Sequence, residues 1–156
     1  MSLHRWSLPV VLLSFFAACP GCGSSDRPEF HQVQGKVTLD GEPLAEATLT
    51  FERIAGEQME FARPSICISG PDGTFAPWTL TEGDGVPAGK YRVGVSAQKA
   101  VGGPTPTEGM TDAEYARIKW KDIVPARYKV TTTSGIEIEV TPDGMIPETI
   151  ALTSQK

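Results

Sequence analysis

The residues best equipped for chemistry are the three cysteines of the chain. Cys19 and Cys22 form a C-x-x-C pair, and Cys67 lies alone between two isoleucines. Such a pair does thiol redox chemistry in a β-α-β context, whereas here it follows an apolar run and precedes a polar segment. A structural zinc site would need a second ligand pair, and the sequence offers none with suitable spacing. We expect Cys67 to be a small buried or half-buried residue, and a Cys22–Cys67 disulfide remains open.

The segment before Cys19 favours lipid attachment. Leu8 to Ala18 is an apolar run of eleven residues, which suits a secretory signal peptide, since a bilayer-spanning helix needs roughly 20 residues. The run ends in Phe-Ala-Ala-Cys and resembles a bacterial lipobox, where the chain is cut before a cysteine that carries diacylglycerol. Phe16 departs from the leucine usual at its position. Cys22 is the alternative lipid site, although Pro20 fits a lipobox badly.

These features divide the chain into three predicted regions. Residues 1–18 are a lipoprotein signal peptide, residues 19–32 a lipidated flexible tether, and residues 33–153 a folded domain. The tether is rich in Gly, Ser, Pro and charge, as flexible linkers are. Several acyl chains on one N-terminus, palmitate among them, would hold the protein at a membrane. We therefore expect an exported protein, anchored to the cell membrane or outer membrane by lipid rather than by a membrane span.

The composition argues against nucleic-acid binding and against histidine-based catalysis. The chain is 40% apolar and carries a formal net charge of −5, with no basic run, so it is a poor candidate for binding nucleic acid. The only imidazole after residue 18 belongs to His31 in the predicted tether. A Ser-His-Asp triad or a histidine metal site therefore cannot be built on the folded domain. We expect no enzymatic activity, no cofactor and no metal.

The carboxylates are also weak candidates for catalysis or metal binding, because most of them lie beside glycine in turn sequences. A general acid needs a pKa raised by burial, which exposed turn residues do not provide. The segment Glu82-Gly83-Asp84 also lacks the spaced oxygen ligands of a calcium loop. The acids in question are Asp40, Glu42, Asp72, Glu82, Asp84 and Asp143.

Apolar residues alternate with polar ones over several short segments separated by Gly and Pro turns. This period of two predicts half-buried strands. About seven such strands with turns between them are typical of an antiparallel β-sandwich. The segments are 33–39, 47–51, 66–68, 74–75, 91–95, 136–140 and 150–152.

One stretch breaks the alternation. Thr111 and Glu114 have the spacing of a capping box, and Tyr115 and Ile118 follow at helical spacing. We predict a short helix over residues 112–121, within a long insertion between two strands. Because so short a helix is marginal by itself, Tyr115 and Ile118 should pack against the edge of the sandwich.

Several of these segments, in their order and spacing, resemble a known family. They are 34–37, 40–44, 47–51, 72–75, 87–93, 123–128 and 133–136. Together they look like carboxypeptidase regulatory-like, transthyretin-like domains, and they are most similar to small lipoproteins of this type that are abundant in planctomycete bacteria. The resemblance covers about residues 33–153. It implies an all-β, seven-stranded antiparallel prealbumin-like sandwich, here with one short inserted helix, that serves as an accessory folding, interaction or display module.

Trp78 and Trp120 are the remaining candidates for a binding site. An exposed indole stacks on sugars or anchors a protein partner, whereas a buried one covers the edge of a core. Two hypotheses follow. In the first, the protein is a non-enzymatic, lipid-anchored cell-envelope protein whose sandwich binds another protein. In the alternative, it is a carbohydrate-binding module that holds envelope polysaccharide through these two tryptophans.

Overall fold

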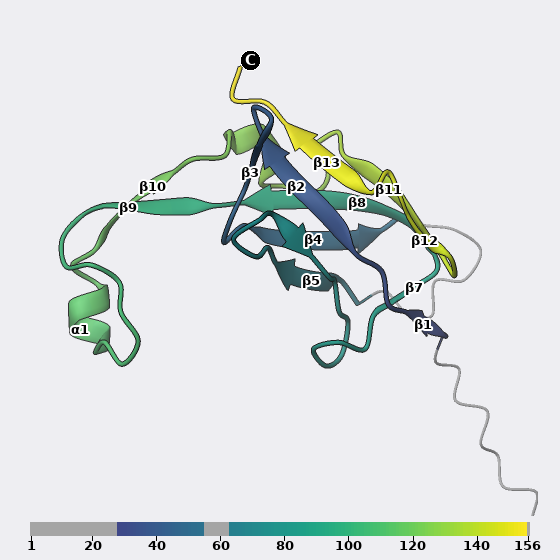
Figure 1. The fold of residues 1–156 in the computed structure, drawn as a ribbon, viewed down its shortest axis with the longest axis horizontal. Coiled ribbons are helices and arrows are strands. Elements are labelled where there is room, and N and C mark those ends of the chain that lie inside the picture. Colours follow the sequence, from purple (N-terminus) through teal and green to yellow (C-terminus); the bar gives the residue numbers. More distant parts are fainter. Residues whose placement is uncertain (1–27, 55–62, 156) are drawn as a thin grey trace, which may run out of the picture.

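The computed structural model describes residues 28–54 and 63–155 (Figure 1). The predicted signal peptide and both candidate lipid sites, Cys19 and Cys22, lie outside the described residues. Strands dominate the described part, so the prediction of an all-β chain is confirmed. The larger sheet has five strands in the order β12 (Gly144–Ile146), β11 (Glu137–Thr141), β8 (Gly89–Ser96), β4 (Thr48–Arg53) and β5 (Ser65–Ile68).

The smaller sheet is built around the first long strand of the described chain. Its order is β13 (Thr149–Leu152), β2 (Gly35–Leu39) and β3 (Glu42–Pro43), and β6 (Thr74–Phe75) also pairs with β2. Two further pairs complete the described strands: β1 (Phe30–His31) with β7 (Val86–Pro87), and β9 (Gln98–Gly102) with β10 (Lys119–Asp122). Within the same described residues, the helical elements are α1 (Asp112–Tyr115) and a 3-10 turn, η1 (Ala126–Tyr128).

The two sheets enclose one hydrophobic core. The predicted inward faces of the central strands are confirmed, since Leu49 and Phe51 of β4 and Tyr91 of β8 are all 1% exposed or less. The Phe51 ring lies 5.9 Å from the Phe75 ring of β6, which links the larger sheet to the smaller one. The Tyr91 hydroxyl donates to the Pro87 carbonyl oxygen at 2.7 Å, so its buried polar atom is satisfied.

The sandwich is not purely antiparallel, which corrects the prediction. The last strand, β13, runs parallel to β2, with Ile150 opposite Val37 and Leu152 opposite Leu39. Hairpins impose antiparallel pairing only on strands that follow one another closely, and parallel strands need a long connection. Here most of the chain separates β2 from β13, so no turn fixes their relative direction.

Strand β5 shows the predicted alternation, and Cys67 is buried, as expected, while the isoleucines on either side of it lie on the outer face. Cys67 lies opposite Leu49 of β4 and is buried, together with Ser65. Ile66 and Ile68 therefore point to the solvent, with 39% and 70% of their surface exposed. The buried Ser65 hydroxyl is satisfied by the Thr79 hydroxyl at 2.9 Å, which allows a polar residue to face inward.

The end of the predicted tether is ordered against the domain. Phe30 and His31 form β1 with Pro87 and Val86 of β7. The Gln32 side-chain amide also donates to the Gly83 carbonyl oxygen at 2.8 Å. In Figure 1, β1 lies at one end of the long axis, and β9, β10 and α1 project from the other end.

Candidate functional site

The feature that departs most from a plain sandwich is a projecting arm, residues 98–122. Strand β8 runs on into β9, which leaves the five-stranded sheet, and β10 returns beside it (Figure 1). A two-stranded ribbon alone is at best marginally stable in water. The arm must therefore be held by contacts at its base and at its tip.

The base of the arm is fixed to the sandwich by a buried side chain and several polar contacts. Val124 is 2% exposed and belongs to the main core. The Ile123 N–H donates to the Ala97 carbonyl oxygen at 3.1 Å, which extends the β9–β10 ladder to the edge of the core. Asp122 pairs with Lys129 at 2.5 Å and accepts from the Gln98 amide at 3.0 Å. These two donors, Lys129 first, lower the pKa of the Asp122 carboxyl.

Near the tip, the two sides of the arm approach closely at a glycine. Gly103 has φ +91°, and a Cβ added there would lie 2.3 Å from the Arg117 carbonyl oxygen. Next to this contact, Ile118 is only 6% exposed. The tip is therefore packed against itself, and only glycine provides both the backbone angle and the space.

The helix of the insertion is shorter than predicted. Thr111 and Glu114 do form the capping box: the Thr111 N–H donates to the Glu114 carboxylate at 3.0 Å. Hydrogen bonds from Thr111, the backbone one first, lower the pKa of Glu114. However, α1 ends at Tyr115, so the predicted helix over 112–121 is wrong in its second half. Residues 119–122 instead form β10, because pairing with β9 supplies hydrogen bonds and packing that a marginal helix lacks.

This difference changes the setting of Trp120. Trp120 lies in β10, opposite Ala100 of β9. Its ring is 5.6 Å from the ring of Tyr115, with 42° between their planes. The prediction that Tyr115 packs against the edge of the sandwich is therefore wrong, because Tyr115 packs on Trp120 instead. Both side chains remain exposed, Trp120 at 37% and Tyr115 at 55% of their surface. The two rings form an exposed aromatic pair at the end of the molecule.

The opposite face of the arm carries lysines that were not among the predicted site residues. Lys99 and Lys121 are directly opposite each other in the β9–β10 register, and all three lysines of the arm, Lys119 included, are exposed. Since side chains alternate along a strand, Trp120 lies on the other face from Lys119 and Lys121. Like charges directly opposite in a sheet are destabilising. The sequence Lys-Trp-Lys-Asp has the period of two that could have revealed this strand.

Trp78 occupies a different part of the molecule. It is half-buried and exchanges two backbone hydrogen bonds with Ile66 of β5, at 2.9 and 3.0 Å. Trp78 thus covers the outer edge of the five-stranded sheet, whereas Trp120 stands on the arm with Tyr115. The structure does not bring the two predicted ligand-binding tryptophans into one site.

The surroundings of Cys67 and of the turn acid Asp84 suit a structural role and not a catalytic one. Burial raises the pKa of the Cys67 thiol to about 12, which keeps it protonated and unreactive near neutral pH. Burial also opposes ionisation of Asp84, but N–H donors from Thr79, Thr81 and Leu80 outweigh it and lower the pKa of that carboxyl. A lowered pKa is the reverse of what a general acid at neutral pH requires.

The surface of the described residues includes two hollows that bear on these elements. One, of about 450 Å³, lies at the base of the arm between Asp122 and Arg127 and also touches Ser154. The other, of about 330 Å³, lies beside Arg92 of β8 and the turn from Thr131 to Ile136.

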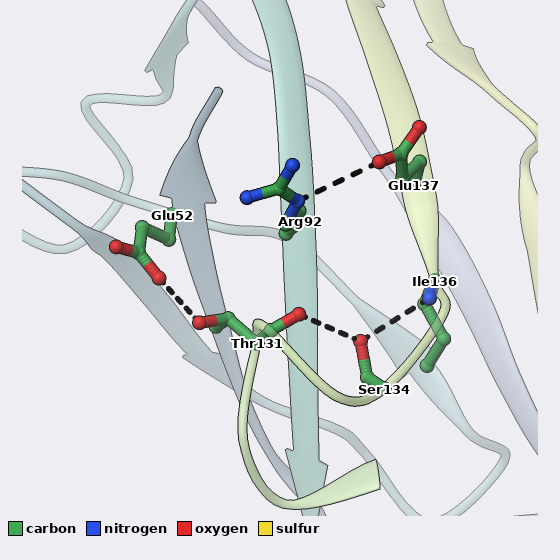
Figure 2. A network of polar contacts seen from close by, with 6 residues as sticks. All are labelled: Glu52, Arg92, Thr131, Ser134, Ile136 and Glu137. Carbon is green, nitrogen blue, oxygen red and sulfur yellow. Dashed lines mark hydrogen bonds and ion pairs between the residues drawn. The ribbon is translucent and has the colours of Figure 1, made fainter. Parts of the chain in front are cut away.

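Figure 2 shows the polar contacts at this second hollow. Arg92 pairs with Glu137 at 3.5 Å, the Thr131 hydroxyl donates to Glu52, and the Ser134 hydroxyl donates to the Thr131 carbonyl oxygen at 3.1 Å. These contacts fasten the turn from Thr131 to Ile136 over the larger sheet.

Comparisons with protein-family models, with curated proteins and with solved structures found no match. Within residues 28–54 and 63–155, no group of three or more His, Cys, Asp or Glu residues is placed to hold a metal ion. The same residues contain no helix of the length and apolar character needed to cross a membrane.

Proposed function

We propose that this protein is a non-enzymatic, lipid-anchored cell-envelope protein whose domain displays the arm so that it can bind another protein. The anchor would be the lipid on Cys19, with Cys22 as the alternative. The domain would be a transthyretin-like, carboxypeptidase regulatory-like sandwich. The observation that carries the proposal is the arm itself: a rigidly based projection with an exposed aromatic pair at the end opposite β1 (Figure 1).

The position of the arm supports display away from the membrane. The predicted tether joins the domain at β1, where Phe30 and His31 pair with β7. A lipid at the far end of that tether would leave the opposite end of the sandwich, and thus Tyr115 and Trp120, free to meet a partner. Exposed aromatic residues of this kind are enriched among the residues that dominate protein interfaces.

Cross-linking in intact cells, followed by mass spectrometry, tests the binding role. We expect a reproducible protein partner that is lost when Tyr115→Ala and Trp120→Ala are combined. The matched control is Ile68→Ala, which removes an exposed apolar side chain from β5 and leaves the arm unchanged. Recovery of the same partner from the double variant would refute the role of the arm.

Membrane fractionation tests the anchor separately. We expect Cys19→Ala to release the protein from membranes, while Cys22→Ala leaves it attached. If the protein lacking Cys19 stays as firmly bound as the unaltered protein, lipid attachment at that residue is refuted.

The exposure of Trp120 also favours a second candidate, carbohydrate binding. An indole that is 37% exposed beside a tyrosine ring can stack on a sugar face. This function predicts quenching of tryptophan fluorescence by envelope polysaccharide, with the effect lost in Trp120→Ala and retained in Trp78→Phe. Absence of quenching by every polysaccharide tried would refute it.

A further inference from the structure

The arm exposes a strand edge whose hydrogen-bonding groups follow from its register. The bond from the Ile123 N–H to the Ala97 carbonyl oxygen marks a hydrogen-bonded pair. Such pairs alternate with non-bonded ones in an antiparallel ladder, so Lys121 bonds to Lys99. The N–H and C=O groups of Trp120 and Asp122 therefore point away from β9, and they have no backbone partner within the described residues.

Of the two edges of the arm, β10 is the regular one. The register shifts between Lys119 and Trp120, which lie opposite Gly102 and Ala100, so Val101 is an extra residue in β9. A bulge of this kind bends its own strand and hinders the pairing of another strand along that edge. Strand β10 carries neither a bulge nor a proline.

Two of the four edges of the sandwich, those at β5 and β3, are better protected. On β5, both outward groups of Ile66 bond to Trp78. On β3, the edge consists of a charged residue and a proline, Glu42 and Pro43. Proteins commonly protect sheet edges with these devices. Strand β10 has neither kind of protection, so its edge is open for pairing.

The side chains of β10 define what would pair with this edge. Lys119 and Lys121 lie on one face, and Lys99 adds a third positive charge opposite Lys121. No acid in the described part of the chain forms an ion pair with these three lysines. On the other face, Trp120 presents an apolar ring. A complementary strand thus has acids on alternate positions and apolar residues between them.

We infer that an acidic, extended segment of another protein adds to β10 as a third, antiparallel strand of the arm. Its acidic residues lie opposite Lys119 and Lys121, and an apolar residue opposite Trp120 exchanges backbone hydrogen bonds with it. Main-chain bonds give such strand addition its affinity, and alternate side chains give its specificity. The inference rests on the proposed binding role of the arm and names the chemistry of its partner.

Short synthetic peptides test the inference on the full-length protein in detergent. One peptide alternates glutamate with valine, and a second has the same composition with the glutamates in one block. Calorimetry should detect binding of the alternating peptide only. Changing Lys119 and Lys121 to Gln should weaken it about threefold per lysine, the weight of an exposed ion pair. The matched control changes Lys36 and Lys90, exposed lysines of β2 and β8, to Gln and should have no effect.

N-methylated peptides separate strand pairing from simple charge attraction. Methylation of the valine nitrogens removes the donors that face Trp120 and should weaken binding at least about tenfold, the loss of more than one hydrogen bond. Methylation of the glutamate nitrogens, which face away, should leave binding unchanged. Equal affinity of the two methylated peptides would overturn the inference.

Three other outcomes would also overturn the inference. Equal binding of the alternating and blocked peptides, with competition by polygalacturonate, would assign the lysines to a polyanionic polysaccharide. If no peptide binds although the cross-linked partner still depends on Tyr115 and Trp120, the arm binds a partner by another mode and the proposed function stands. Loss of that dependence as well would refute both.

Discussion

Replacing Gly103 with Ala should destabilise the arm and leave the sandwich unchanged. The new Cβ would lie 2.3 Å from the Arg117 carbonyl oxygen and 3.0 Å from the Ile118 Cα. Both are backbone atoms, so no side-chain rotation relieves the overlap. Gly109 provides a matched control, since it has φ +82° in the same loop and open space where its Cβ would be.

Both substitutions place alanine at positive φ, but only Gly103→Ala also creates a steric overlap with the backbone. Placing a non-glycine residue at positive φ costs about 1–2 kcal/mol. Gly109→Ala carries that cost alone. Gly103→Ala adds the separation of two backbone segments that hold Ile118 in its buried position, a change we place at about 2 kcal/mol more by comparison with overpacked cores. The arm of the Gly103 variant should therefore open roughly 30 times more often than that of the Gly109 variant.

Amide hydrogen exchange measures this opening directly. The N–H groups of Lys99 and Lys121, which face each other in the ladder, report on the arm. Those of Val37 and Val93, which donate to backbone carbonyl oxygens at 2.8 and 3.0 Å, report on the core. We expect protection to fall at the first pair in Gly103→Ala and to stay unchanged at the second. Equal protection of Lys99 and Lys121 in the two variants would refute the packing assigned to Gly103.

Three further substitutions or treatments test the interior. Because the pKa of Asp84 is lowered in the folded state, the stabilising effect of this carboxylate is present above about pH 4 and is lost as the pH falls through the folded pKa. The urea midpoint of the Asp84→Asn variant should therefore decline less on acidification than that of the unaltered protein. An equal decline in the two proteins would contradict this. Cys67 should react with iodoacetamide at pH 8 only after denaturation, and rapid labelling of the native protein would show that its thiol is accessible. Tyr91→Phe should lower the free energy of unfolding by about 1 kcal/mol, because the buried Pro87 carbonyl oxygen loses its donor; a urea midpoint equal to that of the unaltered protein would contradict this bond.

The sequence predicted those parts of the fold in which one local signal decides the outcome. The Asp40-Gly41 turn is an example, since both residues adopt positive φ in the structure, at 52° and 88°. The capping box at Thr111 is another, because a single pair of side chains defines it. Inward faces of β4 and β8 followed from their strict alternation.

Features that depend on distant partners escaped prediction. Ile66 and Ile68 alternate correctly, yet only the pairing of Cys67 with Leu49 decides which face of β5 is buried. The parallel direction of β13 likewise depends on β2, far away in the sequence. Trp120 was assigned to a helix because residues 112–118 show helical spacing, although the next residues alternate as a strand and find their partner in β9.

The arm combines several features that cost stability, whereas the central strands of the sandwich do not, and this contrast supports a binding role for the arm. In the central strands of the sandwich, β4 and β8, alternation, burial and hydrogen bonding agree, as in a sequence selected to fold. In the arm, Lys99 faces Lys121, Tyr115 and Trp120 stay exposed, and one strand edge lacks partners within the described residues. Each of these features costs stability in the isolated protein, yet the close backbone contact at Gly103 and the fixed base show that the arm is a built structure. A built element that combines like charges, exposed aromatic rings and an open strand edge is expected at a functional surface, where a partner supplies what the chain alone does not.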